Sequence, residues 1–271
     1  MSIKDILVHV DPSPACDQRI SFAMSLAHRF GAFLTGVFVL PTLVMPMPPN
    51  NSAAAVAISK YLSDLEEGAI ATGKEFVSRL RNDGLDGAWH LTRGGAAFSI
   101  ARYARPVDLV VVGQDDPGFS GVLSTPADVV LTCGLPVLVV PYAGRFDRVG
   151  ENAVIAWNGS RECARAVHDA IPLLEPQKKV KVICINPAPD DETTRGHLVS
   201  HLMRQGFDAG AETHSTKELS PGALLLSRVA DIGSDLVVMG AYGHSRLRET
   251  VLGGTTRKML RRMTVPVLMA H

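Results

Sequence analysis

The sequence has no excess of charge of either sign and no long hydrophobic run. Its 27 Lys and Arg residues balance 27 Asp and Glu residues, so overall charge does not attract the chain to nucleic acid or to an anionic membrane. No apolar run approaches the roughly 20 residues that span a bilayer. The N-terminus also lacks the charged, then apolar, then small-residue pattern of a signal peptide. We therefore expect a cytoplasmic protein with no nucleic-acid partner and no membrane partner.

Cysteine is also scarce, and no two cysteines have the C-x-x-C spacing of redox or zinc sites. A reducing compartment disfavours disulfides, so the cysteines are predicted to be small buried apolar side chains. They are Cys16, Cys133, Cys163 and Cys184.

What the sequence does contain is an internal repeat. The segment from Asp108 to Gly113 (DLVVVG) recurs from Asp235 to Gly240 (DLVVMG), and each copy is followed by a similar hydrophobic stretch, LPVLVVPY or VPVLMAH. The two starts also agree, since DILVHVDPS from Asp5 and AVIAWNGS from Ala153 are apolar runs that end in a polar turn. Agreement over nearly the whole chain indicates a duplicated unit. The polar, glycine-containing stretch 143–152 fits a linker between the copies.

Within each copy, short runs rich in Val, Ile and Leu alternate with stretches of helical periodicity, which is typical of βαβ units around a buried parallel sheet. We predict an α/β fold with two tandem doubly wound domains, 1–143 and 152–271. Each has a five-stranded parallel sheet in the order 3-2-1-4-5, flanked by helices. A ligand crevice is expected at the carboxyl ends of the strands, where the strand order reverses. The predicted strands lie near 3–10, 33–40, 87–93, 108–113 and 135–140, and near 152–157, 179–185, 209–215, 235–240 and 265–270.

After the fourth strand of the second copy, a glycine-spaced loop predicts an anion site. Gly240 and Gly243 are followed by Gly253 and Gly254, and Thr255 then stands at the start of a predicted helix. Glycine lets backbone N–H groups approach an anion closely, and the first turn of a helix adds unpaired donors and the positive end of a dipole. The threonine hydroxyl could cap the helix or bind a phosphate.

Local charge separates the two copies. The second-copy stretch from His244 to Arg262 holds six bases and one acid, whereas the first-copy stretch from Gln114 to Cys133 holds three acids and no base. Carboxylates beside a polyphosphate site oppose binding unless a metal intervenes. We therefore expect the nucleotide site in the second copy. The three acids are Asp115, Asp116 and Asp128.

The second-copy loop resembles the signature of the universal stress protein family, G-x2-G-x9-G followed by Ser or Thr, with which that family holds the phosphates and ribose of ATP. The AWNGS turn, the terminal VPVLMAH and the duplication, common in tandem members, strengthen the likeness. Two positions depart from the family pattern. Position 254 is Gly in place of Ser or Thr, and Asn158 stands where ATP-binding members often carry Asp.

This resemblance implies how a nucleotide would be held. The adenine would lie between Trp157 with Asn158 and Ile185 at the ends of the first two strands, and Arg246 would add a charge-assisted bond. The family's pairing of domains through their last strands would join Pro136 and Pro266 segments into an intramolecular pseudo-dimer; association of two whole chains is left open. The phosphates would meet the backbone of Gly240, Gly243, Gly253, Gly254 and Thr255.

The implied function is a stress-response protein that binds ATP, ADP or AMP, with or without Mg²⁺. No GxxxxGK[ST] motif is present, and Glu249 is the only acid in the second loop, so regulation with at most slow hydrolysis is expected rather than enzymatic turnover. The alternative is an interaction module of the same fold that binds a protein or a small ligand other than a nucleotide.

Four other side chains were candidates for site roles. Asp11, at the end of the first strand, is predicted to cap a turn, and Ser160 either caps a helix or contacts the ligand. His197 and His201 are four apart in a predicted helix, a spacing that could hold a metal, but no third ligand is evident and both are predicted to face solvent.

Overall fold

A computed structural model of the chain describes residues 2–42, 53–118, 126–187, 191–243 and 254–271. The first half contains β1 (Asp5–Val10), α1 (Cys16–Phe30), β2 (Phe33–Leu40), α2 (Ala53–Asn82), β3 (Gly87–Arg93), α3 (Ala96–Ala104), β4 (Leu109–Gly113), α4 (Pro126–Cys133) and β5 (Val137–Val140). The second contains β6 (Asn152–Ala156), α5 (Arg161–Ala170), the short 3-10 helix η1 (Ile171–Leu173), β7 (Lys179–Ile185), α6 (Asp191–Arg204), β8 (Asp208–His214), α7 (Pro221–Ile232), β9 (Leu236–Gly240), α8 (Gly254–Arg262) and β10 (Val267–Ala270).

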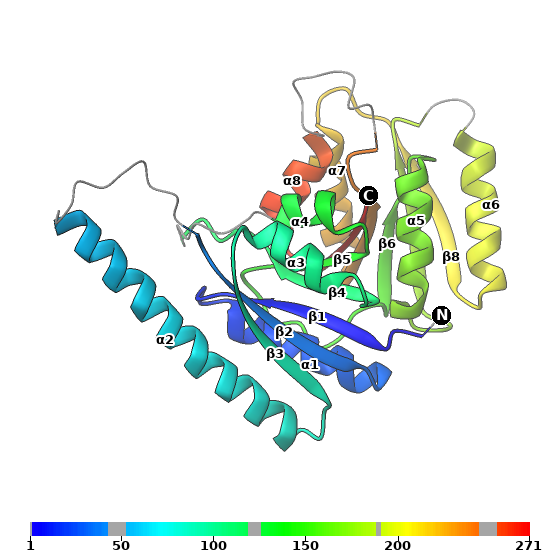
Figure 1. The fold of residues 1–271 in the computed structure, drawn as a ribbon. Helices are drawn as coiled ribbons and strands as arrows, with labels where there is room; N and C mark the ends of the chain where they lie inside the picture. Colours follow the sequence, from blue (N-terminus) through cyan, green and yellow to red (C-terminus); the bar gives the residue numbers. More distant parts are fainter. Residues whose placement is uncertain (1, 43–52, 119–125, 188–190, 244–253) are drawn as a thin grey trace.

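All these strands join one ten-stranded sheet in the order β3-β2-β1-β4-β5-β10-β9-β6-β7-β8 (Figure 1). Neighbours within each half are parallel, and β5 pairs with β10 antiparallel. Each half therefore has the predicted order 3-2-1-4-5. The predicted pairing of the two halves through their last strands is also confirmed, with Leu138 opposite Leu268.

Helices cover both faces of the sheet, which explains why the strands are continuous hydrophobic runs. One core packs the sheet against α1, α2, α5 and α6, and includes Phe22, Phe76 and Leu202. The other packs it against α3, α4, α7 and α8, and includes Ile100 and Met259. Each core contains residues of both halves, so the halves share their hydrophobic interior on both faces of the sheet.

The repeated aspartate that precedes β4 and β9 has the same structural role in both halves. Asp108 accepts hydrogen bonds from the backbone N–H groups of Lys4 and Asp5, at 2.7 and 3.0 Å. Asp235 accepts them from Gly150, Glu151 and Asn152, at 2.8 to 3.1 Å. In each half this carboxylate fixes the chain where the first strand begins.

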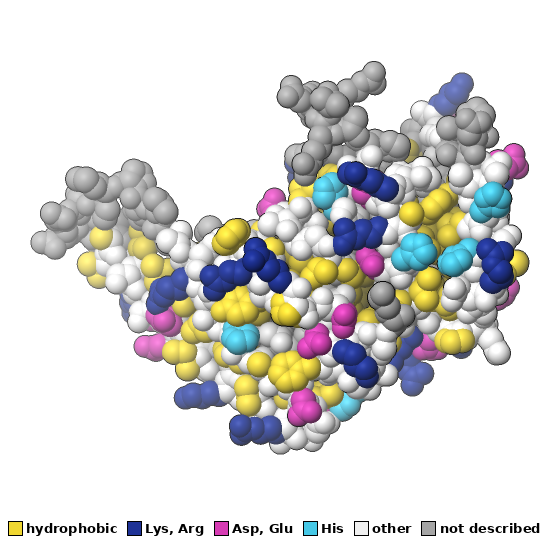
Figure 2. Space-filling view, turned by 45° about the vertical axis from the view of Figure 1, so that its right-hand side comes forward, with side chains coloured by type: hydrophobic (Ala, Val, Ile, Leu, Met, Phe, Trp, Pro, Cys, Tyr) yellow, Lys and Arg dark blue, Asp and Glu magenta, His cyan; other side chains and the backbone are white. Residues whose placement is uncertain are grey.

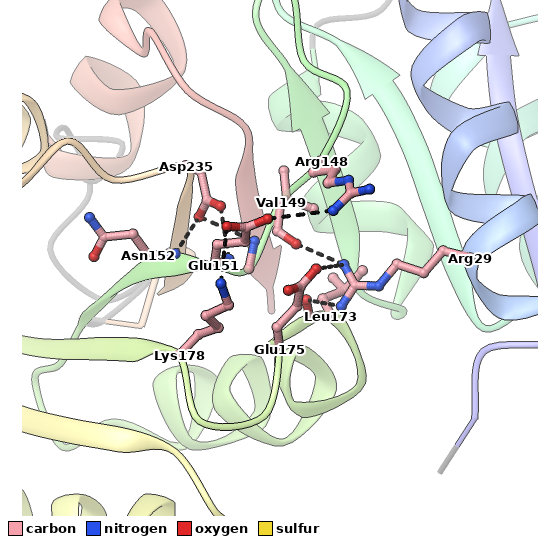
Figure 3. Close-up of polar contacts among 10 residues, drawn as sticks. Arg29, Arg148, Val149, Glu151, Asn152, Leu173, Glu175, Lys178 and Asp235 are labelled. Atoms are coloured by element: carbon pink, nitrogen blue, oxygen red, sulfur yellow. Dashed lines mark hydrogen bonds and ion pairs between the residues drawn. The ribbon is translucent and has the colours of Figure 1, made fainter.

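The chain between the halves is also held by α1 (Figure 3). The Arg29 guanidinium donates to the carbonyl oxygens of Val149, at 2.7 Å, and Leu173, at 3.0 Å. Gly150 lies against the Leu173 carbonyl with φ of 95°, a position at which a side chain would collide with backbone. The connection between the halves is therefore packed in place by contacts from both halves.

Candidate functional site

The candidate site lies where the strand order of the second half reverses, between β6 and β9. Register places Ala156 opposite Met239 at the carboxyl ends of these two strands. The helix that follows β6, α5, packs in one core, whereas the helix that follows β9, α8, packs in the core on the opposite face of the sheet. Helices that leave on opposite faces open a crevice at this edge, which is where doubly wound sheets bind ligands.

The start of α5 forms one wall of this crevice. Ser160 has extended backbone geometry, and its hydroxyl accepts a hydrogen bond from the Cys163 N–H at 3.2 Å. The Asn158 side chain in turn accepts from the Ser160 N–H at 3.1 Å. Of the two roles left open for Ser160, the structure shows the helix cap, and Asn158 shapes the turn that leads into the helix.

Two of the signature glycines bring the end of β9 directly against α5. A Cβ at Gly240 would lie 2.5 Å from the Cys163 backbone nitrogen and 2.7 Å from the Glu162 carbonyl carbon, so only glycine fits there. A Cβ at Gly243 would lie 2.7 Å from Glu162 Oε2 and 3.0 Å from Ser160 Oγ. Gly243 therefore faces side-chain oxygens, whereas Gly240 faces backbone.

The carboxylate of Glu162 was not predicted as part of the site. The residue is 5% exposed, and its Oε1 accepts a hydrogen bond from Arg161 Nε at 2.6 Å. Burial opposes ionisation, but hydrogen bonds from Arg161 and from the helix backbone hold the pKa of Glu162 below its usual value. The site thus contains an ionised side chain beside Gly243. Its position in the first turn after a Ser cap is the one sequence signal that could have indicated it.

The second part of the signature begins α8. The helix starts at Gly254, as predicted, and an added Cβ there would meet none of the described atoms within 4 Å. Thr255 packs against α7, since a Cβ at Gly222 would lie 3.3 Å from Thr255 Cα. Arg246 and Gly253, both predicted to contact phosphate, lie outside the described residues.

The strand ends predicted to flank an adenine lie side by side, because β6 pairs with β7 and the Trp157 N–H donates to the Ile183 carbonyl oxygen at 2.9 Å. Trp157 is partly buried and packs against the core that contains α5, whereas Ile185 packs against the core on the opposite face of the sheet. Side chains alternate between the faces of a strand, and these two fall on different faces. Trp157 therefore packs against the core on the α5 face of the sheet.

In the first half, the corresponding crevice is filled by a buried ion pair. The Arg19 guanidinium, 3% exposed, donates to Asp11 Oδ2 at 2.6 Å and to the His9 carbonyl oxygen at 2.8 Å. A Cβ at Gly113, the counterpart of Gly240, would collide with Arg19 Nη1. Burial alone would raise the pKa of Asp11, but the Arg19 charge holds it below its usual value.

Asp11 also caps the turn before α1, as predicted, by accepting from the Ser13 N–H at 2.9 Å. Its ion pair with Arg19 was not predicted, because a lone Arg in an amphipathic helix normally faces solvent. The sequence signal that could have suggested it is an acid at the strand end with a base within the next helix. Arg19 occupies the space beside Gly113, so the first-half crevice is closed by the protein itself.

The acidic stretch of the first half faces the second half. Burial raises the pKa of Asp115, and the nearby Asp128 raises it further, while Arg261 of α8 opposes the shift. Next to it, the buried Gln114 donates to the Leu260 carbonyl oxygen of α8 at 2.9 Å. Part of the acidic stretch of the first half therefore lies close to a basic residue of the second half, Arg261.

The two histidines of α6 and the cysteines differ in how far they are buried. His197 is exposed, as predicted, but the prediction for His201 is wrong. Its ring lies 5.8 Å from that of His168, so packing between α5 and α6 partly buries it. Cys16, Cys163 and Cys184 are buried, as predicted, whereas Cys133 is only partly buried.

Three further properties concern metals, membranes and charge. Within the described ranges, no three His, Cys, Asp or Glu side chains lie close enough together to hold a metal ion. None of the helices in the described part of the chain combines the length and hydrophobicity needed to cross a bilayer. On the face shown in Figure 2, acidic and basic side chains lie scattered among hydrophobic ones.

Comparison with known proteins identifies relatives along the whole chain. Residues 2–141 and 151–271 each match the model of the universal stress protein family. A universal stress protein of Synechocystis sp. is 53% identical, over 98% of this chain and 99% of its own length.

Solved structures show the same fold at lower identity. A universal stress protein from Archaeoglobus fulgidus DSM 4304 has 15% identity and a TM-score of 0.79, covering 99% of this chain and 96% of that one. A functionally unknown protein from Pseudomonas aeruginosa PAO1 has 16% identity and a TM-score of 0.63, covering 99% and 92%.

Proposed function

Because the chain belongs to the universal stress protein family, we propose that it is a stress-response protein whose second half binds ATP or a related adenine nucleotide, ADP or AMP. One observation carries the proposal. Gly240 and Gly243 bring the backbone at the end of β9 against the first turn of α5, in the crevice between β6 and β9. A helix start and a close glycine backbone are the elements that bind phosphate in α/β folds.

The proposed role of the nucleotide is regulatory. Fast phosphoryl transfer needs a base or a metal-binding acid placed at the reacting phosphate. Glu162, the acid next to Gly243, is already hydrogen-bonded to Arg161. Bound nucleotide, with or without Mg²⁺, is therefore expected to stay bound with at most slow hydrolysis. It would act by occupying the site.

The proposal is tested by denaturing the purified protein and identifying released nucleotides by mass spectrometry, followed by calorimetric titration with ATP and AMP. Gly243→Val should abolish binding, because its Cβ would lie 2.7 Å from Glu162 Oε2 and 3.0 Å from Ser160 Oγ and would fill the space beside the start of α5; circular dichroism checks that the variant stays folded. Gly196→Ala is the control, since a Cβ in the middle of α6 meets no atom within 4 Å. The proposal would be refuted if no adenine nucleotide were released on denaturation and calorimetry showed no binding of ATP or AMP.

One observation favours the alternative of an interaction module that binds no nucleotide. The ionised carboxylate of Glu162 lies where a Cβ on Gly243 would point, and it would repel a phosphate in that place. If the wild-type protein and the Gly196→Ala control both fail to bind ATP, AMP and adenosine, this alternative becomes the better description.

A further inference from the structure

Glu162 is a buried charge in the middle of the proposed site, and the fold does not require it. Ser13 and Ser160 hold matching places after the first strand of each half, and Cys16 and Cys163 each follow three residues later. The position that corresponds to Glu162 is therefore Ala15, which precedes α1. A helix follows the first strand there too, without a carboxylate at that position, although α1 begins at Cys16, which matches Cys163 of α5.

The Glu162 side chain is held in the site. Its Oε1 bonds to Arg161 Nε at 2.6 Å, and its Oε2 lies 2.7 Å from the place of a Cβ on Gly243. Only 5% of the residue is exposed, whereas the Arg161 side chain is 91% exposed. Moving the carboxylate out would remove a negative charge from the positive end of α5.

A buried carboxylate discriminates between ligands by their charge. Repulsion between like charges grows as water is excluded, and salt screens buried charges poorly. A free triphosphate places several negative charges near the start of α5, a monophosphate places fewer, and a nucleoside places none. The penalty imposed by Glu162 therefore rises with the number of phosphates.

We infer that Glu162 makes the second-half site selective for adenine ligands of low charge, a nucleoside or nucleoside monophosphate, over the free triphosphate; this inference rests on the proposed nucleotide function. Glu162 is a specificity-determining residue in this view, since its carboxylate lies beside Gly243, in the backbone segment proposed to bind phosphate.

The test is calorimetric titration of the full-length protein with ATP, AMP and adenosine in EDTA, so that no divalent cation screens the phosphates. Glu162→Gln keeps the size of the side chain and removes its charge. It should tighten ATP binding at least tenfold, tighten AMP binding less, and change adenosine binding by less than twofold. Glu151→Gln is the matched control, because it removes the same charge at the opposite end of β6, and it should change none of the three affinities.

Two further variants keep the test decisive. Glu162→Ala, which copies Ala15, should reproduce the gain in ATP affinity if the Gln variant does not fold. Arg161→Ala, which leaves the carboxylate without its partner, should weaken ATP binding. Equal changes for all three ligands, or no gain for ATP in a wild-type protein that binds adenine ligands, would overturn the inference alone. Absence of binding by any variant to any ligand would instead overturn the proposed function.

Discussion

The ring of His9 is buried at the end of β1, and its Nε2 has no hydrogen-bond partner among the described residues. Burial lowers the pKa of His9 from 6.5 to about 4, against the attraction of Asp11 and with the repulsion of Arg19. His9 of the unfolded chain is therefore protonated near pH 6.5, whereas in the folded protein it stays neutral down to about pH 4. As the pH falls from 6.5 to about 4, the free energy of unfolding should fall by about 3 kcal/mol.

Urea denaturation between pH 7 and pH 4.5 measures this slope. His9→Ala is a suitable control, because Ala156 holds the corresponding position in β6. The variant should lose most of the pH dependence in this range, whatever its stability at pH 7. The pKa of Asp11 is lowered, so its contribution is lost only at still lower pH. An unchanged slope in His9→Ala would show that another group is responsible.

The Arg19–Asp11 ion pair gives a second prediction for single residues. Removing one partner leaves an uncompensated buried charge, so Arg19→Met should destabilise the protein by about 3–5 kcal/mol in urea denaturation. The double variant Arg19→Met with Asp11→Asn should recover much of this loss, because neither buried charge remains. If the double variant were as unstable as the single one, packing by Arg19 would matter more than its charge.

Residue roles could be predicted only where they depend on local sequence. Ser160 and Asp11 act through backbone groups two or three residues away, so their capping roles were open to prediction. Arg19 and Glu162 are buried by glycines at the ends of distant strands, Gly113 and Gly240 with Gly243. Composition and helical periodicity place such charges at the surface, and only the tertiary contact reverses that expectation.

At the scale of elements, the strands followed closely from the hydrophobic pattern. Both DLVVxG segments were predicted as strands and form β4 and β9, because a run that is buried on both faces leaves a continuous apolar signal. The helices between them follow from periodicity and from the need to cross over between parallel strands. The opposite faces of Trp157 and Ile185 were not predicted, because the resemblance specified strand ends rather than side-chain directions.

The junction between β9 and α5 predicts different effects for two glycines of the same signature. Gly240→Ala forces a Cβ against the backbone of α5 and should destabilise the protein by about 3 kcal/mol. Gly254→Ala adds a Cβ that meets none of the described atoms at the start of α8, and it should change stability by less than about 1 kcal/mol. Thermal and urea denaturation of both variants provide the comparison, and equal effects would contradict the close packing at Gly240.

The repeated aspartate provides another test of an element. Asp235→Ala removes the acceptor of three backbone N–H groups, whereas Asp108→Ala removes the acceptor of two. The former should cost about 3 kcal/mol and the latter about 2 kcal/mol of unfolding free energy. The order of the two losses, measured in urea, is the prediction; a larger loss for Asp108→Ala would contradict it.

For the whole molecule, the shared cores predict a single unfolding transition. Leu26 of α1 and Leu202 of α6 belong to the same buried cluster although they come from different halves. Leu26→Ala and Leu202→Ala should each lower the stability of that one transition by about 2–5 kcal/mol. Differential scanning calorimetry should give equal calorimetric and van't Hoff enthalpies. Two transitions, each moved by only one of these substitutions, would show that the halves unfold separately.

The pairing of β5 with β10 was predicted from the family resemblance, whereas the sharing of both cores was not. Hydrophobic patterns show which face of an element is buried but not which half covers it. The contacts of Arg29 with Val149 and Leu173 illustrate the limit, because nothing in the sequence near Arg29 indicates a partner in the other half.

The two halves belong to one chain, and the pairing of β5 with β10 joins them in one sheet, which affects how the protein can change by mutation. In a symmetric dimer of identical chains, every substitution appears twice and alters both crevices. Here a substitution appears once, so the first half can fill the space beside Gly113 with Arg19 while the second half places Glu162 beside Gly243. One half can thus serve as a permanent partner subunit while the other retains freedom to specialise for a ligand.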